Sequence, residues 1–85
     1  MKKIQCPCCG YYTIDGTDEV IVDICPVCYW QYDEVGHDHP DIAVGGPNKQ
    51  ISLNQARENY KKFGASRKDI KLFVREPLEE EKFDN

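Results

Sequence analysis

The chain is 85 residues long, has a net charge of −4, and contains no apolar run long enough for a signal peptide or a membrane helix. A chain of this length forms one small domain whose hydrophobic core gives only marginal stability, so we expect an additional cross-link. We expect a cytoplasmic protein. Reducing conditions there, and the odd total of five cysteines, favour a metal site over disulfides.

The cysteines fall into two short clusters, CPCC at residues 6–9 and CPVC at residues 25–28. When the clusters are aligned, Cys8 stands opposite Val27 and the other cysteines match in pairs. The resulting spacing, C-x2-C-x15-C-x2-C, is typical of sites where two tight turns aim four thiolates at one ion. The predicted ligands of one Zn²⁺ ion are Cys6, Cys9, Cys25 and Cys28.

Two segments between the clusters, 11–14 and 20–24, have the pattern of β-strands. Asp15 and Gly16 lie between them and form a typical turn signal, so the segments predict a β-hairpin. A hairpin flanked by two cysteine turns is the layout of a zinc ribbon.

Four thiolates leave no open coordination position, so the predicted site is structural and not catalytic. Iron bound by the same ligands is the next alternative, and a pair of disulfides is the last. Cys8 is interpreted as a small apolar filler like Val27, with a reactive thiol as the alternative.

Residues 31–48 contain several glycines and prolines and predict an irregular connector. This connector holds His37 and His39, with Asp38 and Asp41 beside them. They could form a second metal site, but alternating histidine and aspartate in an acidic loop is more often solvated, which is the interpretation favoured here.

The segment after the connector predicts an amphipathic helix, with Ser52 as N-cap, Gln55 three residues later and Gly64 as the stop signal. Its apolar stripe, expected to pack on the ribbon, consists of Leu53, Ala56, Tyr60 and Phe63. A short extended segment packed on the core is then expected from Ile70, Leu72, Phe73 and Val74.

The predicted fold is therefore a small α+β domain that combines the ribbon hairpin and its two cysteine knuckles with the connector, one amphipathic helix and a short extended segment. We expect this single domain to span residues 1–75. Residues 76–85 are acidic and poor in apolar side chains, and predict a flexible tail.

Charge is distributed in blocks along the chain. Residues 1–48 carry two lysines against eight acids, residues 49–75 carry eight bases against two acids, and the remaining segment carries one lysine against five acids. We interpret the opposite blocks mainly as docking the two halves of the domain on each other and keeping the surface soluble.

Several motifs in a fixed order resemble the bacterial cysteine-rich CPCC family. These motifs are CPCCGY at 6–11, ICPVCYW at 24–30, Pro40-Asp41, Gly45-Gly46 with Asn48, SLNQAREN from residue 52, and FGAS at 63–66. The resemblance implies a bacterial source and a metal-binding cysteine cluster at the four positions above, and it implies no activity. The same cysteine clusters also resemble a shortened rubredoxin motif, although Tyr29 stands where a rubredoxin has glycine.

Three function classes follow from these observations. The first is a zinc-stapled module that binds a protein partner through the helix or through Tyr29, Trp30 and Tyr32. The second is an electron-transfer protein with iron in the same site. Nucleic-acid binding by the basic segment is third, and the acidic ribbon disfavours it. We expect no enzymatic activity and no small-molecule substrate, because the chain has no nucleophile–base pair and no phosphate loop.

Overall fold

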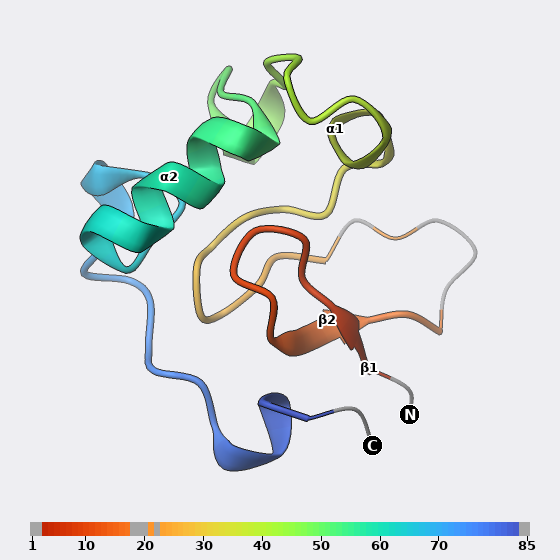
Figure 1. The fold of residues 1–85 in the computed structure, drawn as a ribbon, viewed down its shortest axis with the longest axis vertical. Coiled ribbons are helices and arrows are strands. Elements are labelled where there is room, and N and C mark those ends of the chain that lie inside the picture. Colours follow the sequence, from red (N-terminus) through yellow and green to blue (C-terminus); the bar gives the residue numbers. More distant parts are fainter. Residues whose placement is uncertain (1–2, 18–20, 22, 84–85) are drawn as a thin grey trace.

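The computed structural model describes residues 3–17, 21 and 23–83. It is a small α+β domain in which a two-stranded antiparallel sheet and one main helix lie on either side of the cysteine turns (Figure 1). The predicted fold class is therefore confirmed.

The sheet consists of β1 (Lys3–Gln5) and β2 (Tyr12–Asp15). The strands pair with Ile4 opposite Ile14, and the ladder is irregular between Ile4 and Gln5. The predicted strand at 11–14 thus forms, but β1 is its partner, which sequence analysis did not predict. The first cysteine cluster lies in the loop that connects β1 to β2, so a paired strand flanks its turn on each side.

The second predicted hairpin strand, 20–24, includes residues 20 and 22, which lie outside the described residues. Its end forms a different pairing from the one expected, because Ile24 makes an antiparallel bridge with Gln31 across the second cysteine cluster. The Asp15 amide donates a hydrogen bond to the Asp23 carboxylate at 3.0 Å, which fixes the end of β2 to this region.

The main helix, α2 (Leu53–Phe63), begins and ends as its sequence predicts. The Ser52 hydroxyl accepts the Gln55 amide hydrogen at 3.1 Å, and Gly64 closes the helix with a left-handed φ of 75°. At each end of the helix, one backbone bond is therefore made by a local signal, Gln55 N–H to Ser52 and Gly64 N–H to the Tyr60 carbonyl.

The buried face of α2 is shorter than the predicted stripe. Leu53 and Ala56 are buried and Tyr60 is half-buried against the core. Phe63 is only half-buried, and the Lys68 ammonium lies 5.8 Å from the centre of its ring. The expectation that Phe63 is a core residue is wrong, because the last turn of the helix extends beyond the cysteine turns that the earlier turns cover.

The predicted connector, 31–48, is more ordered than expected. It contains a short helix, α1 (Glu34–Asp38), capped by the Asp33 carboxylate, and a 3₁₀ turn, η1 (Gly46–Asn48). The buried Asn48 side chain holds the connector at its start, since it accepts from the Gln31 amide at 2.9 Å and donates to the Gln31 carbonyl at 3.0 Å.

Trp30 is the largest fully buried side chain and lies in one core cluster with Ile14, Val27, Leu53 and most of the cysteines. The core therefore surrounds the cysteine turns and is not separate from them. No helix among the described residues is long and apolar enough to cross a membrane.

The segment after α2 differs most from the prediction. It forms a 3₁₀ turn, η2 (Lys68–Ile70), which buries Ile70. Leu72 and Phe73, expected to pack on the core, are 90% and 70% exposed. A further 3₁₀ turn, η3 (Glu79–Glu81), follows in the acidic tail and lies against β2, and Glu81 forms a two-point ion pair with Arg75 at 2.8 and 2.9 Å.

Candidate metal centre

The two cysteine clusters adopt the same backbone turn. In the first, the Cys6 amide donates to the Tyr11 carbonyl at 2.8 Å and the Gly10 amide donates to the Cys6 carbonyl at 2.9 Å. The second cluster repeats these two bonds between Cys25 and Trp30 at 2.9 Å, and between Tyr29 and Cys25 at 2.7 Å. Each cluster is therefore a knuckle whose hydrogen bonds set the direction of its two matched cysteines.

The last position of each knuckle requires a left-handed backbone. Gly10 has a φ of 85°, and Tyr29, at the equivalent position, has a φ of 69°. A residue with a Cβ pays about 1 to 2 kcal/mol for this conformation, which glycine adopts freely. Tyr29 therefore adopts the same knuckle conformation as Gly10. The presence of tyrosine where a rubredoxin motif has glycine does not indicate a different turn.

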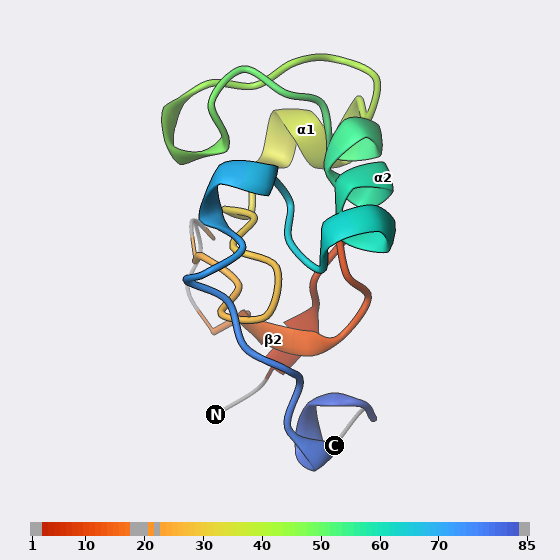
Figure 2. The same cartoon turned by 90° about the vertical axis from the view of Figure 1, so that its left-hand side faces the viewer.

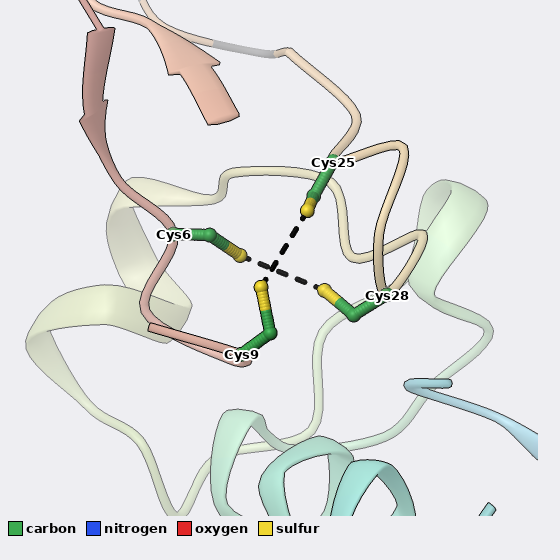
Figure 3. Close-up of side chains that lie close together, drawn as sticks. All are labelled: Cys6, Cys9, Cys25 and Cys28. Carbon is green, nitrogen blue, oxygen red and sulfur yellow. Dashed lines mark hydrogen bonds between the residues drawn. The ribbon is translucent and has the colours of Figure 1, made fainter. Parts of the chain in front are cut away.

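The two knuckles bring together the four cysteines that the spacing predicts (Figure 3). The Cys6 and Cys28 sulfurs are 3.6 Å apart, the Cys9 and Cys25 sulfurs are 3.7 Å apart, and all four lie within 4.8 Å of one another. A tetrahedral zinc ion with Zn–S bonds of about 2.3 Å places its sulfurs about 3.8 Å apart. The observed spacing therefore fits a tetrathiolate centre, and the sulfurs are too far apart for disulfides, whose S–S bond is about 2.05 Å.

The centre is closed to solvent on most sides. Cys6, Cys25 and Cys28 are fully buried, and only Cys9 is partly exposed. Four sulfur ligands in a tetrahedral arrangement fill the coordination sphere of zinc, so the arrangement can hold an ion but leaves no position for a substrate.

The hydrogen bonds around Cys25 favour its ionised form. The Thr13 hydroxyl donates to the Cys25 sulfur at 2.9 Å, and the Val27 amide donates to it at 3.4 Å. The pKa of the Cys25 thiol is lowered, first by hydrogen bonding from Cys28 and also by Thr13.

The other thiols respond in the opposite direction. The pKa values of Cys9 and Cys28 are raised, chiefly by hydrogen bonding with Cys25, and burial adds to the effect. All four sulfurs can be ionised together only beside a cation, which supplies the charge that offsets their mutual repulsion.

A family comparison agrees with this geometry. Residues 4–81 match the family model described as Cysteine-rich CPCC, which is nearly the whole chain. The chain belongs to the cysteine-rich CPCC family. No curated protein matches the chain.

Residues 53–75, which comprise α2 and the segment after it, form hydrogen bonds to both knuckles. Arg57 of α2 donates from Nε to the Pro7 carbonyl at 2.8 Å, which ties the helix to the first knuckle. The second knuckle accepts two amides from the segment after the helix, from Ser66 to the Cys28 carbonyl at 2.7 Å and from Arg75 to the Pro26 carbonyl at 3.2 Å. Figure 2 shows this segment running beside the second knuckle.

These contacts could not be predicted from the sequence, because two of the three donors are backbone amides, which every residue except proline carries. The third, Arg57, is indistinguishable in the sequence from the other bases of its segment. Residues 53–75 therefore hold the two cysteine turns in position, and none of them belongs to the cluster of four sulfurs.

Cys8 is not part of the cluster of four. It is 8% exposed and occupies the position in the first knuckle that Val27, at 1%, occupies in the second. Its burial agrees with the interpretation of Cys8 as a small apolar filler. His37 is exposed and its ring stacks on Tyr32 at 5.5 Å, and within the described part of the chain neither histidine joins a group of potential metal ligands.

Proposed function

We propose that Cys6, Cys9, Cys25 and Cys28 bind one zinc ion and that this ion is structural. The observation that carries the proposal is the convergence of four sulfurs, from two matched knuckles, at tetrahedral spacing. A zinc ion in such a site supplies folding free energy, because the site does not exist in the unfolded chain.

The packing explains why this domain needs such a centre. Its core cluster is formed around the cysteines themselves, and the sheet has only two short strands, a size that is marginal without further support. The ion would join the first knuckle, which belongs to the sheet, to the second, which accepts the amides of Ser66 and Arg75. Zinc binding and folding of both halves should therefore be one event.

We further propose that the stapled domain acts as a protein-interaction module. A closed centre offers no chemistry to a substrate, whereas the surface beside the second knuckle carries the exposed Leu72 and Phe73 and the half-buried Tyr29. Trp30, which the sequence suggests as a contact residue, is fully buried and belongs to the core. The proposed interaction surface therefore excludes Trp30.

Iron in the same site, serving electron transfer, is the second candidate. Two observations favour it: both knuckles share one backbone turn, including the left-handed Tyr29, and Cys25 accepts hydrogen bonds from Thr13 and Val27. Hydrogen bonds to ligand sulfurs tune the reduction potential of an iron–thiolate centre. The sulfur spacing suits either ion, and we propose zinc because a structural ion suffices to explain a core built around the cysteines.

Metal analysis of the protein purified from its native source separates the candidates. One zinc per chain and no visible absorbance is the expected result, because zinc has a filled d shell. A coloured protein with one iron per chain, bleached by reductant, would establish the electron-transfer alternative. Protein made in a foreign host is a poorer sample, because the metal loaded there reflects the metals available in that host.

A further inference from the structure

The surface beside the second knuckle carries an apolar patch formed by Tyr29, Leu72 and Phe73. Leu72 and Phe73 are 90% and 70% exposed, and the Phe73 ring lies 6.5 Å from the half-exposed Tyr29 ring at an angle of 43°. Adjacent large side chains with this exposure cost free energy in water and are typical of contact surfaces.

Backbone hydrogen bonds fix the segment that carries Leu72 and Phe73. The Phe73 amide donates to the Ile70 carbonyl at 2.9 Å, and Ile70 is buried. Two residues further along, the Arg75 amide donates to the Pro26 carbonyl of the second knuckle. Leu72 and Phe73 are therefore presented by a turn that is anchored at both ends, which lowers the entropy cost of binding a partner.

Tyr29 gives an independent reason to regard the patch as functional. Its backbone is in the left-handed region, where Gly10 makes the equivalent turn in the first knuckle. Glycine would make the same turn without strain. What tyrosine adds is a ring on the surface beside Phe73, and strained residues of this kind cluster at binding sites.

The charges around the apolar patch indicate what it binds. Lys68 and Lys71 lie just before Leu72 and Phe73 in the chain, and both are exposed. Neither forms an ion pair with a described residue, and the Lys68 ammonium lies 5.8 Å from the centre of the Phe63 ring. Arg75 is already occupied by Glu81. The segment 49–75 that carries this turn has eight bases against two acids, whereas the preceding segment is acidic.

We propose that the apolar patch, with Lys68 and Lys71 at its rim, docks an acidic segment of a partner protein that carries an aromatic or aliphatic anchor. The exposed rings and Leu72 would cover the anchor, and the two ammonium groups would face the partner's carboxylates. This inference rests on the proposed interaction function and adds the surface and the chemistry of the partner.

The test is selection of a random-peptide display library on the full, zinc-loaded chain in reducing buffer, followed by affinity measurement of the enriched peptides. The test variant carries Leu72→Ser and Phe73→Ser, and the matched control carries Val35→Ser, which alters an apolar side chain of α1 that is 55% exposed. Zinc stoichiometry and melting temperature are measured for all three proteins.

Enriched peptides should contain apolar residues and more Asp and Glu than Lys and Arg. They should bind the double variant about tenfold or more weakly than the parent, and the Val35→Ser control with unchanged affinity. The affinity of the same peptides for a Lys68→Glu, Lys71→Glu variant should fall as the salt concentration is lowered, whereas their affinity for the parent should rise.

Three results would overturn the inference: no enriched peptide, basic peptides, or peptides that bind the double variant as well as the parent. Concentration-dependent dimers that the double variant abolishes would assign the patch to a second copy of the chain and contradict the inference as well. If the three proteins keep one zinc each, these failures leave the metal centre intact. Failure to hold zinc in the parent would instead contradict the proposed function.

Discussion

Replacing Thr13 by Val removes one hydroxyl from the metal centre and nearly preserves side-chain shape. The Thr13 hydroxyl is buried and donates to the Cys25 sulfur at 2.9 Å, and the Val27 amide donates to the same sulfur at 3.4 Å. A hydrogen bond to a charged group contributes about 1.5 to 3 kcal/mol. Under the proposal that zinc binding and folding are coupled, we expect the loss as a decrease in zinc affinity of about tenfold to a hundredfold.

The assay is competition for zinc between the protein and a coloured chelator of known affinity, in reducing buffer at neutral pH. Thr17→Val is the matched control, because its hydroxyl also forms a side-chain bond, to Asp15 at 2.7 Å, but lies on the surface. This control should change zinc affinity by about threefold or less. Thr13→Ser, which keeps the hydroxyl, should recover much of the affinity.

A Thr13→Val protein that competes for zinc as well as the parent would refute the reasoning. It would mean that Cys25 needs no donor once a cation is bound, or that the sulfur is not a ligand. The Cys25→Ser variant separates these two explanations, because only loss of a ligand lowers the zinc stoichiometry.

Three further predictions follow from packing around the centre. Leu53→Ala, at a side chain that is 1% exposed, should lower the free energy of unfolding of the zinc-loaded protein by about 2 to 5 kcal/mol in chemical denaturation. Phe63→Ala should lower it by about 1 kcal/mol, because Phe63 is half-buried, and equal losses would contradict this difference in burial. Cys8→Val should keep one zinc and change stability by less than about 1.5 kcal/mol, since Val27 fills the equivalent place, and loss of zinc would make Cys8 a participant in the centre. Arg57→Met, which keeps the aliphatic stem but not the bond to the first knuckle, should lower the free energy of unfolding by about 1 to 2 kcal/mol, and an unchanged value would show that this bond adds no stability.

The cysteine centre could be predicted from the sequence because its information is local. Each knuckle has a four-residue cysteine cluster that contains a proline and is followed by a residue in the left-handed conformation, and matching the two clusters pairs the sulfurs without knowledge of the fold. The termini of α2 were predictable for the same reason, since Ser52 and Gly64 act on the backbone next to them.

The rest depends on contacts between distant residues. β1 has only three residues, too few for their alternation to predict a strand, and it is ordered by pairing with β2. The exposure of Leu72 and Phe73 could not be predicted either, because apolar side chains in a short segment have the same pattern whether they cover a core or form a contact surface.

Titration of the metal-free, reduced chain with Zn²⁺, followed by circular dichroism and by amide NMR spectra, tests the central claim most directly. We expect ordered structure to appear in proportion to added zinc and to saturate at one ion per chain, and we expect Cys9→Ser to lose both the ion and the ordered structure. A chain that is already folded before zinc is added, or a Cys9→Ser protein with full zinc content and an unchanged melting curve, would contradict it.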